Sequence, residues 1–595
     1  MKQLLSGNEA LALGAYHAGV VVAAAYPGTP STEILENLAR LDGIYVEWST
    51  NEKVALEVAM GAAYGGVRAL ATMKHVGLNV AADPFFAAST TGIVGGLVVV
   101  SCDDPGEHSS QGEQDNRHLA RFAKVPMLEP TDSQEAYDLM DWVFKISEEF
   151  DTPVLLRATT RISHCKTVVD VNRARKSDLK PASFIRSPSK YVMVPSNARP
   201  RRNVMEDRIV KLCSYVESFP MNQMILQDRK LGIVTSGVAY QYAREVFKNA
   251  SFLKLVTTYP IPANLVRRFA KEVERVVVVE ELDPYLEEEL RCLGIPVTGK
   301  DFVPIIGELT PEIVEQGAIK VGLLQAPKHV PKPAALPQLP ARRPQLCAGC
   351  PHVGTEYILR KLCFKDSKVP GPIKEDEIIV TSDIGCYTLG VYPPLAALDT
   401  CACMGASIGQ AIGLEKAKVP NKVVAVLGDS TFLHGGMTGL VDAVYNQANI
   451  TVIILDNVTT AMTGHQGHPG TGISARGQKV TVVKLEEVVK GLGVKDVHVV
   501  NAFDLKAIES ALKHCLDTKE PSVIISRAPC PLSVRVVNTP YKVDAEGCTS
   551  CYTCLDIGCP AISLADDKAV IDASTCQGCS ICAQVCPEEA ISKAT

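Results

Sequence analysis

The sequence predicts a multidomain α/β protein that ends in a cysteine-rich segment. A chain of 595 residues is long for one hydrophobic core, so about three to five domains are expected. Apolar, strand-like runs alternate with Ala/Gly-rich helical runs, which is typical of parallel α/β domains. Eight of the 20 cysteines lie in short repeated spacings near the C-terminus. The composition, 46% apolar and 21% charged, is that of a soluble globular protein.

The predicted elements fall into successive segments. In the first domain, VVVAAAYPG and GLVVVSC are expected strands and EKVALEVAMGAAYGG an expected helix. A mixed stretch with the basic run SNARPRRNV then looks like a connector, and LGIVTSGVAYQYAREVF opens a smaller α/β domain. A proline-dense linker, unsuited to a regular helix or a central strand, precedes a third domain with buried strands at KVVAVLGD and ITVIILDN. We expect a first domain at 1–190, a connector at 187–230, a small domain at 228–322, a linker at 323–345, a third domain at 346–535 and the cysteine-rich domain at 540–595.

Charge and terminal sequence narrow the function classes. The net charge is −6 and the basic residues are scattered, so neither a nucleic-acid-binding stripe nor a membrane-surface patch is expected. The N-terminus lacks the apolar core and cleavage site of a signal peptide, and the apolar stretch Gly92–Val100 is too short to span a bilayer. We therefore expect a cytoplasmic protein.

The C-terminal cysteines have the spacing of metal ligands. In a reducing compartment such short spacings indicate metal binding and not disulfides. The runs read C-x2-C-x2-C-x4-C-P and C-x2-C-x2-C-x3-C-P, and the second matches the bacterial ferredoxin pattern, in which the fourth cysteine of each run crosses to the other cluster. Zinc is the alternative, but the tail lacks the histidines common in zinc sites. The predicted 4Fe–4S ligands are Cys548, Cys551, Cys554 and Cys586 for one cluster, and Cys576, Cys579, Cys582 and Cys559 for the other.

A second motif predicts a magnesium diphosphate site. GDSTFLHGG follows the strand KVVAVL directly, and the strand ITVIIL leads into Asp456-Asn457. This pair resembles the signature of thiamine diphosphate enzymes, GDG followed by Asn, with Ser430 in place of the second Gly. Asp429 and Asn457 would supply hard oxygen ligands to Mg²⁺, and Gly428 would let the backbone approach the phosphates. The resemblance adds the backbone carbonyl of Thr459. The alternative for GDS alone is a strand-end turn.

A thiamine enzyme also needs a glutamate to hydrogen-bond the aminopyrimidine ring of its cofactor. In many such enzymes this residue opens a helix after a strand in a different domain. The segment STNEKVALEVAMGAAYGG has that form, which indicates Glu52, with Glu57 as a rival. A helix-start glutamate stabilised by the helix dipole is the alternative interpretation.

Together these motifs resemble the 2-oxoacid:ferredoxin oxidoreductases, and among them the indolepyruvate-oxidising subfamily, over essentially the whole chain. The resemblance is carried by YPGTPSTEI, TNEK, CAGCPH, DIGCYTLG, CMGAS, GDSTFLHGG, DNVTTAMTGHQ and the terminal cysteine runs. It implies that the first domain binds the pyrimidine ring, that the third binds the diphosphate, and that the small domain is transketolase C-terminal-like. It also implies a separate small beta subunit and an (αβ)2 assembly.

The reaction implied by this resemblance is oxidative decarboxylation of an aryl-pyruvate. With CoA and oxidised ferredoxin it gives aryl-acetyl-CoA, CO2 and reduced ferredoxin; the protein supplies orientation and electrostatics. Thr29 resembles a substrate-binding threonine of the pyruvate enzymes. Arg117 could match their carboxylate-binding arginine, with a helix-surface salt bridge as the alternative. The resemblance also assigns cofactor contacts to the CMGAS loop, at Cys403, Met404 and Gly405.

A third cluster, nearer the cofactor, is a further prediction. Related oxidoreductases carry a proximal 4Fe–4S cluster held by a C-x2-C pair, a cysteine after a following strand and one near the end of the domain. Cys401 and Cys403 are rivals, and buried structural thiols are the alternative. The four positions that resemble the proximal ligands are Cys347, Cys350, Cys386 and Cys530.

Two other functions remain open at this point. One is a non-oxidative thiamine decarboxylase that releases an aldehyde, which would have no use for electron carriers. The other is an electron-transfer subunit whose α/β domains no longer bind thiamine diphosphate, which the presence of Asp429, Asn457 and Glu52 argues against.

Overall fold

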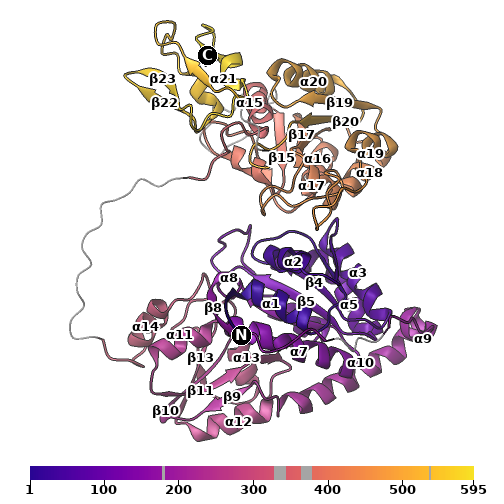
Figure 1. Cartoon of the computed structure of the whole chain (residues 1–595), viewed down its shortest axis with the longest axis vertical. Helices are drawn as coiled ribbons and strands as arrows, with labels where there is room; N and C mark the ends of the chain where they lie inside the picture. The colour runs from indigo at the N-terminus through magenta and orange to yellow at the C-terminus, as the bar shows by residue number, and fades with distance from the viewer. Residues whose placement is uncertain (177–180, 327–342, 364–377, 535–537, 595) are drawn as a thin grey trace. The chain divides into compact units, whose positions relative to one another are not determined.

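The chain forms two compact units, Met1–Ala334 and Ala335–Thr595 (Figure 1). The computed structural model describes residues 1–176, 181–326, 343–363, 378–534 and 538–594. Most of the expected linker at 323–345 lies outside these residues. Within them, no helix has both the length and the apolar character needed to cross a membrane.

A seven-stranded sheet with the order β12-β6-β7-β5-β4-β2-β3 organises the first unit. Neighbouring strands are parallel, except that β12 runs antiparallel to β6. The central strands β4, β5 and β7 are buried throughout because helices cover the sheet, as their continuous apolar sequences predict. The strands are β2 (Val22–Ala25), β3 (Tyr45–Trp48), β4 (Ala69–Lys74), β5 (Leu97–Asp103), β6 (Met127–Leu128), β7 (Val154–Thr159) and β12 (Thr257–Tyr259).

The helices of this part connect successive strands. An antiparallel ribbon of β1 (Lys2–Ser6) and β8 (Lys166–Asp170) brings the start of the chain beside residues that follow the last parallel strand. The helices are α1 (Gly7–His17), α2 (Thr32–Ala39), α3 (Glu52–Tyr64), α4 (His75–Val80), α5 (Ala82–Thr91), α6 (Arg117–Ala123), α7 (Ser133–Phe150) and α8 (Thr160–His164).

The smaller predicted domain forms its own sheet but does not stand alone. Its order is β14-β13-β10-β11-β9, and it contributes β12 to the larger sheet. Leu253 and Val278 of the small sheet belong to the same hydrophobic core as Met127 and Leu155 of the large one. Its elements are β9 (Gln223–Ile225), β10 (Asp228–Ser236), β11 (Ala250–Leu255), β13 (Arg275–Val279), β14 (Val297–Thr298), α11 (Ala239–Val246), α12 (Ala263–Glu272), α13 (Tyr285–Cys292) and α14 (Pro311–Lys320).

The basic run expected to be a connector is helical. SNARPRRNV lies in α10 (Pro195–Val216), after the short α9 (Pro188–Tyr191). Tertiary contacts fix the helix despite its internal proline: Arg201 pairs with Asp151 at 3.0 Å, and the buried Arg208 donates to the Ser89 carbonyl at 2.8 Å. Arg201, in the basic run, and Arg208, after it, therefore anchor α10 to the helices of the first sheet.

The second unit is built on a six-stranded sheet of order β16-β15-β17-β18-β20-β19, parallel throughout. Its central strands β17 and β18 are the two that the sequence predicted. The elements are β15 (Ile378–Ser382), β16 (Thr400–Cys401), β17 (Lys422–Gly428), β18 (Thr451–Asp456), β19 (Asp496–Asn501), β20 (Ser522–Arg527), α15 (His352–Cys363), α16 (Ala406–Lys416), α17 (Asp429–Thr431), α18 (Met437–Tyr445), α19 (Leu485–Gly491) and α20 (Leu505–Asp517).

The cysteine-rich tail packs against this sheet domain and shares its core. Ile557 and Ile581 of the tail are buried in the same cluster as Val353 of α15 and Leu512 of α20, and Figure 1 draws the yellow tail beside these helices. The tail consists of two antiparallel strand pairs, a 3-10 helix (Thr553–Ile557) and one short α-helix. Its other elements are β21 (Tyr541–Val543), β22 (Ile562–Ala565), β23 (Lys568–Ile571), α21 (Ile581–Val585) and β24 (Ile591–Lys593).

Candidate active site

Two carboxylates lie at the ends of adjacent parallel strands in the second unit. Asp429 follows β17 and Asp456 ends β18, and the two strands pair with Gly428 opposite Leu455. Both carboxylates are buried. Burial raises the pKa of Asp456, and the neighbouring charge of Asp429 raises it further. Two buried carboxylates at the carboxyl edge of a parallel sheet stand where α/β proteins bind ligands.

Asp429 organises the loop that follows β18. Its Oδ2 accepts hydrogen bonds from the backbone N–H of Val458 at 2.9 Å and contacts His468 Nε2 at 3.1 Å, while Oδ1 accepts from Ser430 N–H at 2.8 Å. Val458 has a φ of 59°, which is rare for a β-branched residue. Such strained backbone concentrates at functional sites, and here it turns the Asn457–Thr459 segment toward Asp429.

The two residues predicted to complete the magnesium site, Asn457 by its side chain and Thr459 by its backbone carbonyl, are buried in this loop. Asn457 Oδ1 accepts from Thr459 N–H at 3.2 Å, and its Nδ2 lies 3.3 Å from His352 Nε2. Burial lowers the pKa of His352 to about 4, so this ring is neutral at physiological pH. Ser430 accepts a hydrogen bond from the Thr460 hydroxyl at 2.9 Å. The carboxylate and amide oxygens gathered here are the ligand types that Mg²⁺ prefers.

A buried aspartate after β15 fixes the CMGAS loop. Asp383 Oδ2 accepts hydrogen bonds from Gly405 N–H and from the Ser407 hydroxyl, both at 3.0 Å. Gly405 has a φ of 85° and a Cβ there would lie 2.9 Å from the Gly435 carbonyl carbon, so only glycine fits. Cys403 is exposed and Met404 half-buried at the start of this loop.

The four candidate proximal cysteines come together next to the loop that follows β18. This loop, which contains Asn457–Thr459, is called the diphosphate loop below. Burial raises the pKa of Cys350 well above its usual range, and the nearby thiols of Cys386, Cys347 and Cys530 raise it further. Burial also raises the pKa of Cys386, to about 11, and the thiols of Cys530 and Cys347 add to this rise. Cys386 opens a 3-10 helix after β15, and the backbone N–H of Cys530 donates to the Asn457 carbonyl at 3.0 Å. The rivals Cys401 and Cys403 are both exposed, and neither is among the thiols that raise the pKa values of Cys350 and Cys386.

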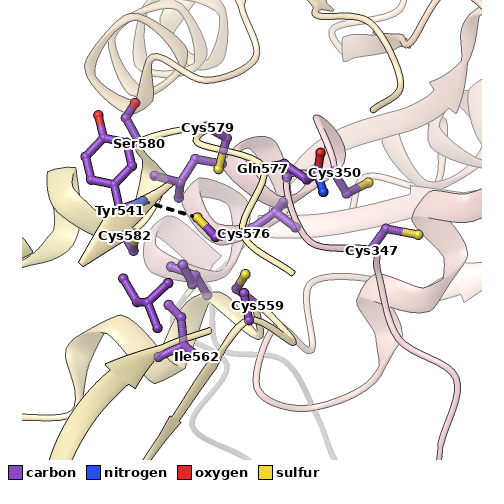
Figure 2. A pocket seen from close by; sticks show the side chains of 16 residues that line it. Cys347, Cys350, Tyr541, Cys559, Ile562, Cys576, Gln577, Cys579, Ser580 and Cys582 are labelled. Carbon is purple, nitrogen blue, oxygen red and sulfur yellow. Dashed lines mark hydrogen bonds between the residues drawn. The ribbon is translucent and has the colours of Figure 1, made fainter. Parts of the chain in front are cut away.

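The tail cysteines line two cavities, grouped as the crossed ferredoxin pattern groups them. One cavity is lined by Cys559 together with Cys576, Cys579 and Cys582, and by Cys347 and Cys350 of the CAGC loop (Figure 2). A second cavity is lined by Cys586 together with Cys548, Cys551 and Cys554. The described cysteines form no disulfide. Four thiols around each small cavity fit a 4Fe–4S cluster.

The CAGC loop touches the tail directly. Burial raises the pKa of Cys559, while backbone N–H groups of Ala561 and Gly349 hydrogen-bond its thiol and lower it. Gly349 has a φ of 71°, and a Cβ there would lie 2.5 Å from Gln577 Cβ. The backbone between Cys347 and Cys350 therefore packs on the cysteine group that contains Cys559.

In the first unit, Glu52 opens α3 and is 5% exposed. Asn51 caps the helix by accepting from Val54 N–H at 2.9 Å. The turn into α4 lies against the carboxyl group, since a Cβ at Gly77 would sit 2.6 Å from Glu52 Oε1. Glu57, the rival, is exposed and pairs with Lys53 on the helix surface. Thr29 is half-buried in the turn that follows β2.

Arg117 is neither a surface residue nor free for a substrate. It is 1% exposed and its guanidinium donates to Asp115 and to Glu280, the latter at 2.6 Å. It also donates to the carbonyls of Glu281 and Asp283 at 2.9 and 3.0 Å. The salt bridge weighed from the sequence is therefore present, but it is buried and does not lie on the helix surface, and the carboxylate-binding role finds no support in this arrangement. Arg117 joins the two sheets of the first unit.

Sequence reasoning missed several polar residues of these sites. His352, His468 and Asp383 contact the predicted cofactor loops, and Lys74 lies buried beside the Thr29 turn. His352 and Asp383 stand in CAGCPH and DIGCYTLG, motifs that had been selected for their cysteines. His468 lies in the His/Gly-rich loop after Asn457. The motifs were thus located, but periodicity could not show which of their polar residues point inward.

Comparison with known families places these features. The family profile described as "Pyruvate flavodoxin/ferredoxin oxidoreductase, thiamine diP-bdg" matches residues 13–205. "Thiamine pyrophosphate enzyme, C-terminal TPP binding domain" matches 383–526 and "4Fe-4S binding domain" matches 569–592. The profiles cover the helix that carries Glu52, the loops of Asp429 and Asn457, and part of the cysteine tail.

Curated relatives match over the full length. The indolepyruvate oxidoreductase subunit IorA of Archaeoglobus fulgidus is 40% identical, covering 100% of this chain and 98% of the relative. The subunits of the same name from Methanothermobacter thermautotrophicus and Pyrococcus horikoshii are 42% and 39% identical, covering 99% and 100% of this chain and 97% of each relative. The chain therefore belongs to the indolepyruvate oxidoreductase subunit IorA family of 2-oxoacid:ferredoxin oxidoreductases, which use thiamine diphosphate and iron–sulfur clusters.

Proposed function

We propose that the chain catalyses the oxidative decarboxylation of an aryl-pyruvate with CoA, giving aryl-acetyl-CoA and CO2, and transfers the electrons to ferredoxin. The observation that carries this proposal is the contact between Cys530 and Asn457, because it joins a four-cysteine group to the diphosphate loop. A decarboxylase that released an aldehyde would have no use for an electron carrier at that position.

Asp429, Asn457 and the Thr459 carbonyl would hold Mg²⁺, and Gly428, Ser430 and the Cys403–Gly405 loop would contact the cofactor. The fit rests on the buried carboxylates of Asp429 and Asp456, whose mutual repulsion a divalent cation would relieve. When bound, thiamine diphosphate supplies the nucleophilic carbon and the electron sink that decarboxylation requires. The loop residues hold the diphosphate end in place.

Glu52 would hydrogen-bond the aminopyrimidine ring and hold the proton that activates the cofactor. Its burial at the start of α3 keeps the carboxyl group out of water, and Gly77 leaves the space that the carboxyl group needs. Thr29, in the turn beside Lys74, would contact the substrate. These are roles for general acid–base and positioning groups.

The cysteines would hold three 4Fe–4S clusters in series. The proximal ligands would be Cys347, Cys350, Cys386 and Cys530, next to the diphosphate loop. The CAGC loop then packs on the group of Cys559, Cys576, Cys579 and Cys582, and Cys548, Cys551, Cys554 and Cys586 form the remaining group. This order would carry electrons from the cofactor toward ferredoxin.

A smaller beta subunit would complete the enzyme in an (αβ)2 assembly; the relatives are named as subunits, which supports a partner chain. The test is an anaerobic assay of the co-expressed complex with a 2-oxo acid, CoA and oxidised ferredoxin. Acyl-CoA formation with ferredoxin reduction supports the proposal. Aldehyde as the product, with ferredoxin unchanged, would favour the non-oxidative decarboxylase, and failure to bind thiamine diphosphate would favour a pure electron-transfer subunit.

A further inference from the structure

A buried lysine ends the fourth strand of the first unit. Lys74 is the last residue of β4 and only 7% of it is exposed. Its ammonium donates to the carbonyl of Ser109 at 2.5 Å and lies 3.5 Å from the Ser109 hydroxyl. Burying a charged lysine is costly unless the charge is paired. In the described part of the chain, no carboxylate lies within 4.0 Å of this ammonium, and the two oxygens that it contacts, both of Ser109, are neutral.

The position of Lys74 is that of a ligand-binding group. It stands at the carboxyl edge of a parallel sheet, where α/β folds bind small molecules. Lys74 Cβ is 3.0 Å from the place that a Cβ on Gly28 would occupy, and Gly28 precedes Thr29. The Ser109 hydroxyl that Lys74 approaches also lies 3.4 Å from the Thr29 carbonyl. Lys74 and the Thr29 turn therefore form one corner of the site.

The same segment leads directly to Glu52. After Lys74 the chain enters α4, and Gly77 in its first turn packs on the Glu52 carboxyl group. A group bound between Lys74 and the Thr29 turn would thus lie one helical turn along the chain from the contact with Glu52. This turn separates the charge of Lys74 from Glu52. Lys74 and Glu52 can therefore act on different parts of the molecules that bind at the site.

Neighbouring charges leave the ammonium available to an anion. Asp104 is the acidic group that faces Lys74, but its oxygens accept from Ser109 N–H at 2.8 Å, from the Ser110 hydroxyl and from the Thr160 hydroxyl at 2.7 Å. His75, the next residue, directs Nε2 to the Gly112 carbonyl at 3.1 Å. Arg117, the other cationic candidate, is committed to Asp115 and Glu280.

We propose that Lys74 binds the carboxylate of the 2-oxo acid substrate, with the Thr29 turn beside it. This inference rests on the proposed function and deepens it, since it assigns the anionic end of the substrate to a residue of the first unit. The ammonium exchanges its neutral partners for a carboxylate and holds the keto acid by the group that is lost as CO2. A charged hydrogen bond of this kind stabilises binding far more than a neutral one.

The test compares the kinetics of Lys74→Gln, Lys74→Arg and wild type in the co-expressed complex, with phenylpyruvate as substrate. Lys74→Gln should raise KM by about tenfold to a hundredfold, because a hydrogen bond to a charged group is lost. Lys74→Arg, which keeps the charge, should recover part of the affinity, and thiamine diphosphate binding should be unchanged in both. Lys190→Gln is the matched control: that lysine is also partly buried but pairs with Asp151, and its KM should equal wild type.

The pH profile provides a readout that a merely structural lysine would not move. Burial lowers the pKa of Lys74 to about 8 against the opposing effect of Asp104. Since the ammonium exists below that pKa, wild-type kcat/KM for phenylpyruvate should fall as pH rises through about 8, and this fall should be absent in Lys74→Gln. Asp104 and His75 titrate well below this range, because hydrogen bonds lower the pKa of Asp104 despite burial and burial lowers that of His75.

The outcomes separate the two proposals. Wild-type turnover together with an unchanged KM in Lys74→Gln overturns the assignment of Lys74 and leaves the proposed function standing. Absence of wild-type turnover with every aryl-pyruvate overturns both. A raised KM that Lys74→Arg does not recover at all, with weakened thiamine diphosphate binding, would show that Lys74 only supports the local fold, which also contradicts the inference.

Discussion

The backbone N–H of Cys530 donates a hydrogen bond of 3.0 Å to the carbonyl oxygen of Asn457. Asn457 is a predicted magnesium ligand, and Cys530 is a predicted ligand of the proximal cluster. On the other side of Asn457, its amide lies 3.3 Å from His352, two residues after Cys350. The diphosphate loop and the proximal cysteine group are therefore held in a fixed arrangement by direct contacts within one unit.

Removing the charge of Asp429 should weaken cofactor binding strongly. Asp429→Asn loses a ligand charge at the predicted Mg²⁺ site. Loss of a residue that only hydrogen-bonds a metal ligand lowers metal affinity by up to about 100-fold. We therefore expect the Mg²⁺-dependent affinity for thiamine diphosphate to fall by at least that factor. Calorimetric titration measures this, and the visible absorbance of the clusters should remain that of wild type. Normal cofactor binding in the variant would remove Asp429 from the site.

Glu52→Gln should bind thiamine diphosphate yet fail to activate it. Loss of a positioned acid–base group typically slows proton transfer by about 10²- to 10⁴-fold, so exchange of the cofactor's C2 proton, followed by NMR, should slow to that extent. Glu57→Gln is the control, because Glu57 pairs with Lys53 on the helix surface. Wild-type exchange in Glu52→Gln and slow exchange in Glu57→Gln would transfer the role to Glu57.

Cys530→Ser should remove one cluster. Three 4Fe–4S clusters correspond to about twelve irons per chain and two to about eight. Anaerobic iron analysis with EPR should show this loss while the tail clusters persist. Cys515→Ser is the matched control, since Cys515 is buried in the same unit but belongs to none of the three groups. Eight irons in the wild type, unchanged by Cys530→Ser, would contradict the proximal cluster.

Gly349→Ala should disturb the junction between the CAGC loop and the tail. The new Cβ would lie 2.5 Å from Gln577 Cβ, and the residue has a φ of 71°. Overpacking of this kind costs about 1–3 kcal/mol. Thermal unfolding should therefore begin at a lower temperature, and the EPR signal of the cluster that Cys559 would bind should shift. Gly413→Ala, in α16 with open space around it, should be neutral or stabilising by about 0.5–1 kcal/mol. If the two variants unfolded at the same temperature and gave the same EPR signal, the proposed junction between the CAGC loop and the tail would be contradicted.

Aryl substrates should be preferred over pyruvate. The loop after Asn457 carries Met462, which resembles a polar asparagine position of the pyruvate enzymes and is 52% exposed. An apolar, adaptable side chain suits an aryl group. A panel of 2-oxo acids should therefore give a higher kcat/KM for indolepyruvate or phenylpyruvate than for pyruvate, and Met462→Asn should narrow the difference. Better turnover of pyruvate by the wild type would contradict this prediction.

The parts predicted from sequence were those in which a local pattern determines the geometry. Continuous apolar runs predicted β17 and β18, and their shared carboxyl edge brings Asp429 and Asp456 together. The alternation of strands and helices predicted the α/β class, which the structure and the family profiles confirm. Regular cysteine spacing indicated which tail residues share a cavity.

Long-range contacts decided the features that sequence could not predict. The strand β12 leaves its own sheet and pairs with β6 more than a hundred residues earlier, so two predicted domains share one core. Arg201 and Arg208 hold α10 in place through partners in distant segments, and these contacts could not be predicted from the basic stretch itself. The buried ion pair of Arg117 could not be predicted, because its partner Glu280 is remote in sequence.

Cofactor chemistry should deliver electrons into the clusters, and one anaerobic measurement tests this transfer directly. Indolepyruvate is added to the oxidised, co-expressed complex with thiamine diphosphate, Mg²⁺ and CoA but without ferredoxin, and the visible absorbance of the clusters is followed. We expect the cluster absorbance to bleach rapidly in the wild type and not at all in Asp429→Asn, although dithionite should bleach both proteins. Consumption of indolepyruvate with release of an aldehyde and no bleaching would contradict it.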